Sequence, residues 1–478
     1  MKRQGNRLAL LIFLLSLILN FVFTIPVLSD PKRAYQADSE EYESLALSLL
    51  NSNDYPSINR TPGYPFFIAT IYAIFGVKPA AVIIFQAILN SLSTMLVYLV
   101  GKLIFDPKVA LAGAFIYAVN PLQLLYSSQL MTEMLFTFIL LIAMYFFLIF
   151  IKNEKTINMI VAAFFFALST MCRPIGLFLP VIIAFIIPIL LKKTLKLKIL
   201  YSGVFLFLYL LFLMPWAIRN YVRYEVFTVS TISQYNLVYY NAAGVIAEVD
   251  HISFSEANTK LEEMIFKEGK KIHAEFERRD SKYIFEDPLL LRNPELRKMA
   301  LNIGLNSIRN NFSAYLKTHL IGVIKTLAFP PLGIYQIKRH FHNSEFTDLV
   351  GMDEDEQAEL LSESNNKDIY NLLKTRLLKL PSVLRFLWIY ASLFMVMQYI
   401  AVFYSLKSLF GKTQMKYVII LLILILYFVL IPGIAGNSRF RVPVEPYLAV
   451  IAGIGLAVIL NNLKEVKMLF KRKTTLNE

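Results

Sequence analysis

Cysteine and charge are both scarce in this 478-residue chain. Only one cysteine, Cys172, is present, which excludes an intramolecular disulfide framework. Charged residues make up 17% of the chain and hydrophobic residues 56%, which is more apolar surface than a soluble core of this size normally buries. The composition therefore favours a protein whose solvent is largely the lipid bilayer.

Motifs for nucleotide, nucleophile and metal chemistry are also missing. The chain has no Walker loop, no Gly-rich dinucleotide fingerprint and no G-x-S-x-G elbow. His340 and His342 have no further ligand at metal spacing, and the acidic run 353–359 lacks the spacing and the glycine of an EF-hand. We therefore expect no cofactor and no metal site.

The chain instead contains many apolar windows without Asp, Glu, Lys or Arg. Most approach the roughly 20 residues that cross about 30 Å of hydrocarbon. The windows lie at about 8–28, 79–101, 109–128, 134–151, 156–172, 174–191, 199–216, 386–406, 417–435 and 446–463. They predict an all-α polytopic membrane protein with about ten transmembrane helices.

The first window lies near the start of the chain, and the fifth and sixth windows are short and adjacent. The first window is too long for the apolar core of a cleaved signal peptide, so we interpret it as a retained helix. The windows at 156–172 and 174–191 are short and meet at Arg173-Pro174, which predicts a tight outer hairpin.

The distribution of Lys and Arg predicts the topology. Basic residues cluster in alternate short loops, at 2–7, 102–108, 152–155, 192–198, 407–416 and 464–473, whereas the loops between them are mixed or acidic. The positive-inside rule then places both termini in the cytoplasm. We expect a multi-pass plasma membrane protein, and its net charge of +14 reflects this topology and gives no support to nucleic-acid binding.

The chain divides into three parts. Residues 1–218 form an N-terminal transmembrane module with a first outer loop at 29–78, residues 219–383 form an extracytoplasmic region, and residues 384–478 contain the last transmembrane helices and a cytoplasmic tail.

Two helices are predicted within the extracytoplasmic region. Residues 255–279 have apolar residues at helical spacing, and we expect this helix to be capped by Ser255. Lys317, His319 and Lys325 interrupt the apolar segment 312–334, which we interpret as an interfacial helix on the outer leaflet, with a re-entrant path as the alternative.

Charged residues gather at the outer ends of the helices and are absent from the middle of the spans. Proton-coupled and ion-coupled carriers usually need ionisable groups near the middle of the bilayer, so this pattern argues against a coupled carrier. The outer charges are Asp38, Glu40, Glu41, Glu43, Arg60, Glu133, Arg173, Arg219, Arg223, Arg439, Arg441 and Glu445. A lone arginine at a helix end usually reaches lipid headgroups, which is our interpretation of Arg223 and Arg441. Together the set predicts a site at the lipid–water boundary on the outer face.

Six segments in a fixed order resemble one enzyme family. They are ADSEEYESLALSLL (37–50), NRTPGYPFFIATIYAIFG (59–76), NPLQLLYSSQLMTEMLF (120–136), RPIG (173–176), MPWAIRNYVRYEVFTVST (214–231) and GNSRFRVPVEPYLAVIAG (436–453). The chain resembles the bacterial branch of glycosyltransferase family 39, in the GT-C superfamily of polyprenyl-phosphate-sugar-dependent enzymes. This resemblance implies a GT-C-type helical bundle and an inverting glycosyltransferase that uses a polyprenyl-phosphate-linked sugar donor.

The resemblance also implies roles for the outer charges. Asp38 matches the acidic residue of the family's first outer loop and is the expected base. Glu133 and Glu41 are expected to hold the acceptor or the sugar. The arginines expected to bind the donor phosphate are Arg60, Arg173, Arg219 and Arg439.

Some alternatives stay open at the level of sequence. Some relatives place two adjacent acidic residues in the first loop, whereas Ser39 follows Asp38 here, so Glu41 is a second choice for the base. Arg60 stands where some relatives have Lys. The acceptor is a lipid, a glycan or a protein, and a divalent metal is used elsewhere in the superfamily. The competing functions are a carrier or flippase for lipid-linked glycans, and a polymerase or ligase.

Overall fold

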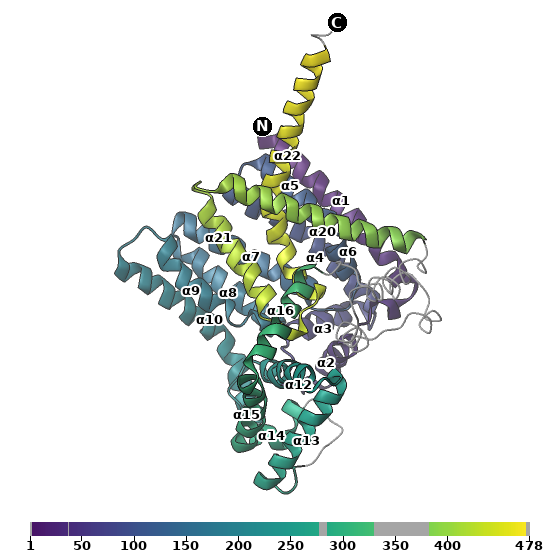
Figure 1. Ribbon diagram of the computed structural model, residues 1–478, viewed down its shortest axis with the longest axis vertical. Coiled ribbons are helices and arrows are strands. Elements are labelled where there is room, and N and C mark those ends of the chain that lie inside the picture. Colours follow the sequence, from purple (N-terminus) through teal and green to yellow (C-terminus); the bar gives the residue numbers. More distant parts are fainter. Residues whose placement is uncertain (1, 37, 277–283, 329–381, 475–478) are drawn as a thin grey trace.

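The computed structural model describes residues 2–36, 38–276, 284–328 and 382–474 (Figure 1). Within these ranges the chain forms helices and no strand. The predicted all-α membrane class is therefore confirmed.

Six helical segments in the described ranges are long and apolar enough to cross a bilayer. Five of them lie in α1 (Lys2–Ser29), α4 (Pro79–Ile104), α7 (Glu133–Asn153), α10 (Leu195–Tyr224) and α20 (Ser382–Leu409). The sixth, Ser438–Leu460, includes the 3-10 helix Ser438–Val444 and the first part of α22 (Glu445–Thr474). The pair α5 (Pro107–Ala118) and α6 (Pro121–Ser127) is apolar enough for a seventh span but bends by 54°. The bend falls at Asn120-Pro121, because Pro121 lacks an N–H and the Asn120 side chain caps α6.

Four further apolar helices are shorter than a full span. They are α3 (Gly63–Phe75), α8 (Thr156–Cys172), α9 (Leu179–Leu190) and α21 (Met415–Leu430). Each predicted window thus falls on helical segments. Length and composition alone support six or seven spans in the described residues, so the count of about ten stays a prediction.

Small residues allow the C-terminal helices to pack closely against the N-terminal bundle. A Cβ added to Gly113 of α5 would lie 2.9 Å from the carbonyl oxygen of Ala449 in α22, and one added to Gly455 would lie 1.8 Å from that of Ala401 in α20. Such backbone approach is typical of helix packing in membranes. The approach of Gly113 to Ala449 joins segments more than 300 residues apart in the sequence, whereas that of Gly455 to Ala401 packs two C-terminal helices together.

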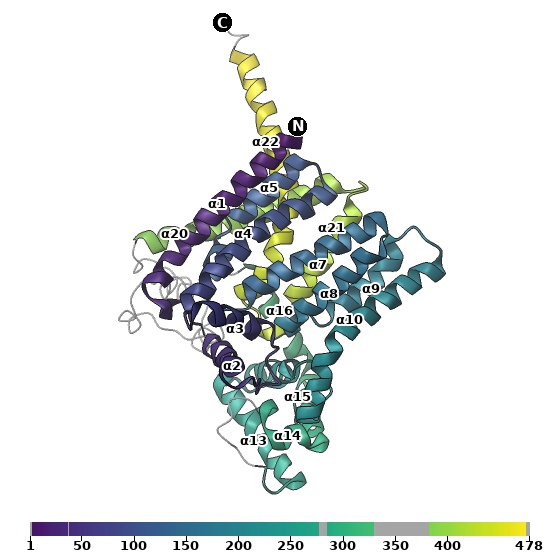
Figure 2. The ribbon, with the colours of Figure 1, turned by 180° about the vertical axis from the view of Figure 1, so that it is seen from behind.

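A second group of helices lies at the end of the molecule opposite both termini (Figures 1 and 2). It contains the π-helix Asn236–Ala242, α12 (Ala243–Asp250), α13 (Phe254–Ile272), α14 (Pro288–Arg292) and α15 (Pro294–Asn310). These helices have their own apolar core, which includes Val238, Leu261 and Leu296.

The helix predicted at 255–279 begins earlier and ends earlier than expected. Its cap is Ser253, not Ser255, because the Ser253 side chain accepts from the backbone N–H of Glu256 while the Glu256 carboxylate accepts from the N–H of Ser253. The helix ends at Ile272, and residues 277–279 of the predicted range lie outside the described residues.

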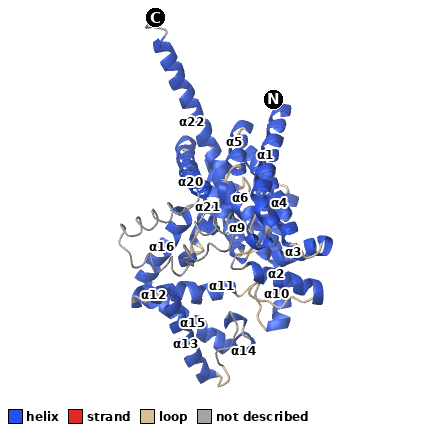
Figure 3. Cartoon of the chain, turned by 90° about the vertical axis from the view of Figure 1, so that its right-hand side faces the viewer, coloured by secondary structure: helices blue, strands red, loops and turns tan. Residues whose placement is uncertain are grey.

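Two helices lie where the bundle meets the second group, as Figures 2 and 3 show. They are α2 (Ser39–Ser52) and α16 (Phe312–Ala328). The rest of the segment predicted at 312–334 lies outside the described residues, as do His340, His342 and the acidic run 353–359. α2 and α16 flank the cluster of charged residues described next.

Candidate active site

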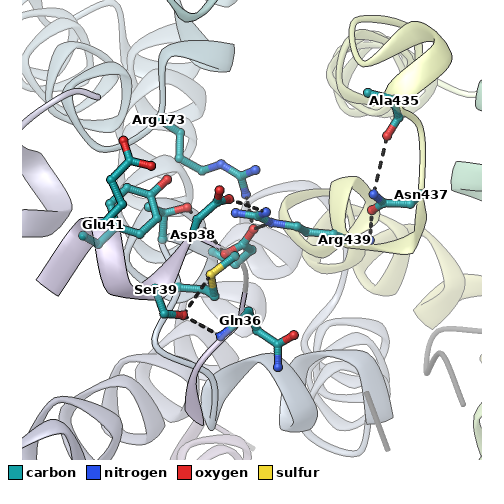
Figure 4. A network of polar contacts seen from close by, with 12 residues as sticks. Gln36, Asp38, Ser39, Glu41, Arg173, Ala435, Asn437 and Arg439 are labelled. Atoms are coloured by element: carbon teal, nitrogen blue, oxygen red, sulfur yellow. Dashed lines mark hydrogen bonds and ion pairs between the residues drawn. The ribbon is translucent and has the colours of Figure 1, made fainter. Parts of the chain in front are cut away.

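Asp38 lies between two arginines that come from distant parts of the chain. Its Oδ1 accepts from Nη2 of Arg60 at 2.9 Å, and its Oδ2 accepts from Nη1 of Arg439 at 2.8 Å. Arg60 precedes α3, and Arg439 lies in the 3-10 helix Ser438–Val444 before α22. The carboxylate is thus held on both oxygens. Figure 4 shows the side that faces Arg439.

Arg60 also binds Glu41 through a pair of parallel hydrogen bonds. Its Nε and Nη2 donate to Oε1 and Oε2 of Glu41, both at 2.9 Å. The guanidinium carbon lies 5.2 Å from the centre of the buried Tyr42 ring. Arg60 therefore bridges Asp38 and Glu41, which lie one helical turn apart at the start of α2.

Glu133 is the buried partner of the other two arginines. Its side chain is 0% exposed, and its Oε1 accepts from Nη1 of Arg173 at 2.8 Å and from Nε of Arg439. Arg173 lies between the rings of Phe136 and Phe440. Arg439 consequently links Glu133 to Asp38.

Backbone contacts fix the two loops that bring these groups together. The Ser39 hydroxyl accepts from the N–H of Gln36 and donates to the carbonyl of Leu130, 2.9 Å away. The side chain of Asn437 accepts from the N–H of Arg439 at 2.9 Å, which begins the short helix that presents the guanidinium (Figure 4). The start of α2 is thereby held against the loop before α7.

The charges in the cluster balance, with three carboxylates facing three guanidinium groups. Burial alone would raise the pKa of Asp38, but Arg439 and Arg60 outweigh burial and hold the pKa well below its usual range. Asp38 is therefore ionised at neutral pH. Among the described residues no three His, Cys, Asp or Glu side chains form a metal-ligand set, and the carboxylates here face arginines.

Arg219 does not join this network. Its Nη1 donates to the carbonyl of Ser57 at 3.2 Å, its Nη2 donates to the carbonyl of Tyr55, and its guanidinium lies 4.7 Å from the Trp216 ring. Arg219 thus supports the loop that carries Arg60. The other six candidate site residues lie in one network.

Sequence reasoning missed a contact between this loop and the second group of helices. Glu286 accepts from the hydroxyl of Ser57 at 2.8 Å, and the same hydroxyl accepts from the N–H of Arg60. Burial raises the pKa of Glu286. A single Glu in an irregular stretch carries no sequence signal, so only the structure reveals this contact.

The interpretation of Arg441 as a headgroup-binding residue is wrong, and that of Arg223, whose side chain is 38% exposed, stays a prediction. Arg441 is 0% exposed, and its Nε donates to Glu445 at 2.7 Å while its Nη1 donates to the carbonyl of Leu327 at 2.9 Å. Arg223 pairs with Asp54. The partner of Arg441 is four residues further along the chain, whereas Arg223 and Asp54 are 169 residues apart and their pairing is not visible in the sequence.

One third of the chain matches the sequence model of an enzyme family. Residues 59–218 match the sequence model of the dolichyl-phosphate-mannose-protein mannosyltransferase family. The matched range includes Arg60, Glu133 and Arg173 and ends before Arg439. No curated protein sequence matches the chain.

Solved structures resemble the chain over nearly its whole length. The archaeal oligosaccharyltransferase AglB from Archaeoglobus fulgidus, in complex with an inhibitory peptide and a dolichol-phosphate, superposes with a TM-score of 0.52 at 16% identity. The match covers 98% of this chain and 52% of AglB, so this chain spans about half the length of that enzyme.

Two further solved structures resemble the chain, with different TM-scores. AglB tethered to an acceptor peptide gives a TM-score of 0.51 at 14% identity, over 98% of this chain and 51% of AglB. ArnT from Cupriavidus metallidurans bound to undecaprenyl phosphate gives 0.41 at 10% identity, over 94% of this chain and 77% of ArnT. Residues 59–218 therefore carry the sequence pattern of the mannosyltransferase family, and the chain as a whole has the fold of the GT-C superfamily of membrane glycosyltransferases.

Proposed function

We propose that this protein is an integral-membrane inverting glycosyltransferase that moves a sugar from a polyprenyl-phosphate donor to an acceptor on the extracytoplasmic side. The observation that carries the proposal is the Asp38 carboxylate held between Arg60 and Arg439. It places a proton acceptor beside two cations at one end of a helical bundle. The family match at 59–218 and the likeness to AglB, whose structure contains a dolichol-phosphate, support it.

In the proposed reaction the acceptor hydroxyl or amine attacks the anomeric carbon of the sugar. A bond from the acceptor to that carbon forms, the bond from the carbon to the phosphate oxygen breaks, and the acceptor proton passes to Asp38. Arg60 and Arg439 neutralise the charge that grows on the leaving phosphate, as fixed guanidinium groups do. Arg173 and Glu133 orient Arg439.

The proposed sidedness is supported by charge and by the fold. The alternation of basic loops along the sequence predicts that these loops share the side of both termini, which the positive-inside rule assigns to the cytoplasm. The second group of helices, next to which the charged cluster lies, is at the opposite end of the molecule (Figure 1). The active site would then face the outside of the plasma membrane, where a lipid, glycan or protein acceptor is reached.

The replacement Asp38→Asn tests the assignment of the base. We expect sugar transfer to fall by roughly 10²–10⁴-fold, the usual contribution of a general base, because the amide cannot take the acceptor proton. A strain without the gene would be complemented with each variant, and its envelope glycolipids and glycoproteins compared by mass spectrometry. The missing sugar identifies donor and acceptor together.

The matched control is Glu40→Gln, which removes one carboxylate from an exposed neighbour on α2. Transfer by the control should equal that of the unchanged protein. Normal transfer by the Asp38→Asn protein, inserted at normal levels, would contradict the assignment. A purified protein that moves labelled lipid across vesicles without changing its headgroup would point to a flippase instead.

A further inference from the structure

The three carboxylates of the network differ in how easily they can leave their arginines. The side chain of Glu133 is 0% exposed and that of Glu41 is 20% exposed. A fully buried carboxylate that loses its cations is left without solvation, whereas an exposed one is rehydrated. Asp38 is 21% exposed, but it is paired with both Arg60 and Arg439. Glu41 is therefore the more easily displaced anion, and Glu133 is the fixed one.

The contact between Glu41 and Arg60 has the geometry of an arginine–phosphate contact. Two parallel N–H···O bonds of 2.9 Å leave one edge of the guanidinium, from Nε and Nη2. The same fork binds two phosphate oxygens. A carboxylate at this edge and a phosphate at this edge exclude each other.

Arg60 is held in place by contacts that do not involve Glu41. Its N–H donates to the Ser57 hydroxyl at 3.0 Å, its carbonyl accepts from the Tyr55 hydroxyl at 3.1 Å, and its guanidinium lies over the Tyr42 ring. The first two contacts fix the backbone of Arg60 and the third supports its guanidinium, so the guanidinium stays in the cluster when Glu41 moves away.

We infer that Glu41 is an intramolecular stand-in for the donor phosphate, and that donor binding exchanges Glu41 for the phosphate on the Nε–Nη2 edge of Arg60. This inference rests on the proposed function. A sugar linked to a polyprenyl phosphate through a phosphodiester carries one negative charge, so the exchange keeps the charge of the cluster balanced. Glu41 then has the role of a competing anion and not of a sugar ligand.

The exchange also changes Asp38. Nη2 of Arg60 serves both Asp38 and Glu41, so a phosphate that draws this group toward itself weakens its hold on Asp38. A carboxylate with one cation less is a stronger proton acceptor. The base is thereby activated only when the donor is bound.

Phosphate affinity of the full-length protein tests the exchange directly. Isothermal titration with a short-chain polyprenyl phosphate, and separately with inorganic phosphate, would compare the unchanged protein with Glu41→Gln. We expect the variant to bind both about three- to tenfold more tightly, because an ion pair of about 1 kcal/mol no longer has to be broken. Glu40→Gln, with the same loss of charge on the exposed side, should leave both affinities unchanged.

Unchanged or weaker binding of the polyprenyl phosphate by Glu41→Gln would overturn the inference, because Glu41 would then only orient Arg60. A gain confined to inorganic phosphate would overturn it as well. The gain should vanish when Arg60→Gln is combined with Glu41→Gln, and its persistence would place the phosphate elsewhere. If Glu41→Gln does not fold, Glu41→Asp, which is too short for the same fork, should also bind more tightly.

The proposed function and the inference can fail separately. Sugar transfer by Asp38→Asn decides the first and needs no affinity measurement. The affinity of Glu41→Gln decides the second and needs no knowledge of the sugar or the acceptor.

Discussion

At the scale of single residues, burial gives chemically equal carboxylates different tasks. Glu133 is enclosed and binds two arginines, whereas Asp38 keeps 21% of its side chain exposed between two arginines. An enclosed ion pair is costly to break, because the remaining charge cannot be hydrated. We therefore expect replacement of Glu133 to lower the stability of the protein, and replacement of Asp38 to lower sugar transfer.

The replacement Glu133→Gln should destabilise the protein strongly. It removes the negative charge that faces Arg173 and Arg439, and uncompensated buried charge costs roughly 3–5 kcal/mol. The melting temperature of the purified protein in detergent should fall by several degrees. Asp38→Asn, at a more exposed position, should shift it less. Equal melting temperatures for the Glu133→Gln and unchanged proteins would contradict the structural role.

Individual residues also show where sequence reasoning stops. The pattern of outer helix ends brings Asp38, Arg60, Glu133 and Arg439 to one face, and the structure places them in one network. The sequence pattern does not place Arg219, because it does not determine which way a side chain at the end of a helix points. Arg219 holds backbone carbonyls of Tyr55 and Ser57 instead.

At the scale of elements, α16 packs against the turn that precedes Arg439. A Cβ added to Gly322 of α16 would lie 1.9 Å from the carbonyl oxygen of Gly433, and one added to Gly436 would lie 2.1 Å from that of Gly322. The backbone of α16 therefore touches the turn that leads into the short helix with Arg439. Nη1 of Arg441 adds a hydrogen bond to Leu327 of α16.

The replacement Gly322→Ala should disturb this contact. In an exposed helix, Gly→Ala stabilises by roughly 0.5–1 kcal/mol, but here the new methyl group forces α16 away from the turn and displaces Arg439. We expect a lower melting temperature and less sugar transfer.

Gly203→Ala in α10 is the matched control, since a Cβ there meets open space. It should leave transfer unchanged and keep or raise the melting temperature. If Gly322→Ala behaves in the same way, α16 does not set the position of Arg439.

At the scale of the whole molecule, the two ends of the structure differ. Both termini lie at one end and the group α12–α15 lies at the other (Figures 1 and 2). The basic loops predict that the end with the termini faces the cytoplasm. The orientation can be tested because Cys172, the only cysteine, is buried.

Introduced cysteines should react according to this orientation. Glu263→Cys in α13 should be labelled by a membrane-impermeant maleimide in intact cells, and Lys412→Cys in the loop before α21 should be labelled only after lysis. Both positions are exposed, and the unchanged protein is the control, since Cys172 should not react. Labelling of Lys412→Cys in intact cells would reverse the topology.

The sequence by itself determined the class of the protein, because apolar windows and the placement of Lys and Arg depend on transfer into the bilayer and need no tertiary contact. It also determined which charges share a face. The tertiary structure decided the pairings: Arg60 with Asp38 and Glu41, Arg173 and Arg439 with Glu133, Arg441 with Glu445. Apart from Arg441 and Glu445, which are four residues apart, these pairs join residues 19 to 306 positions apart. They depend on helix rotation and close backbone packing, which no local pattern encodes.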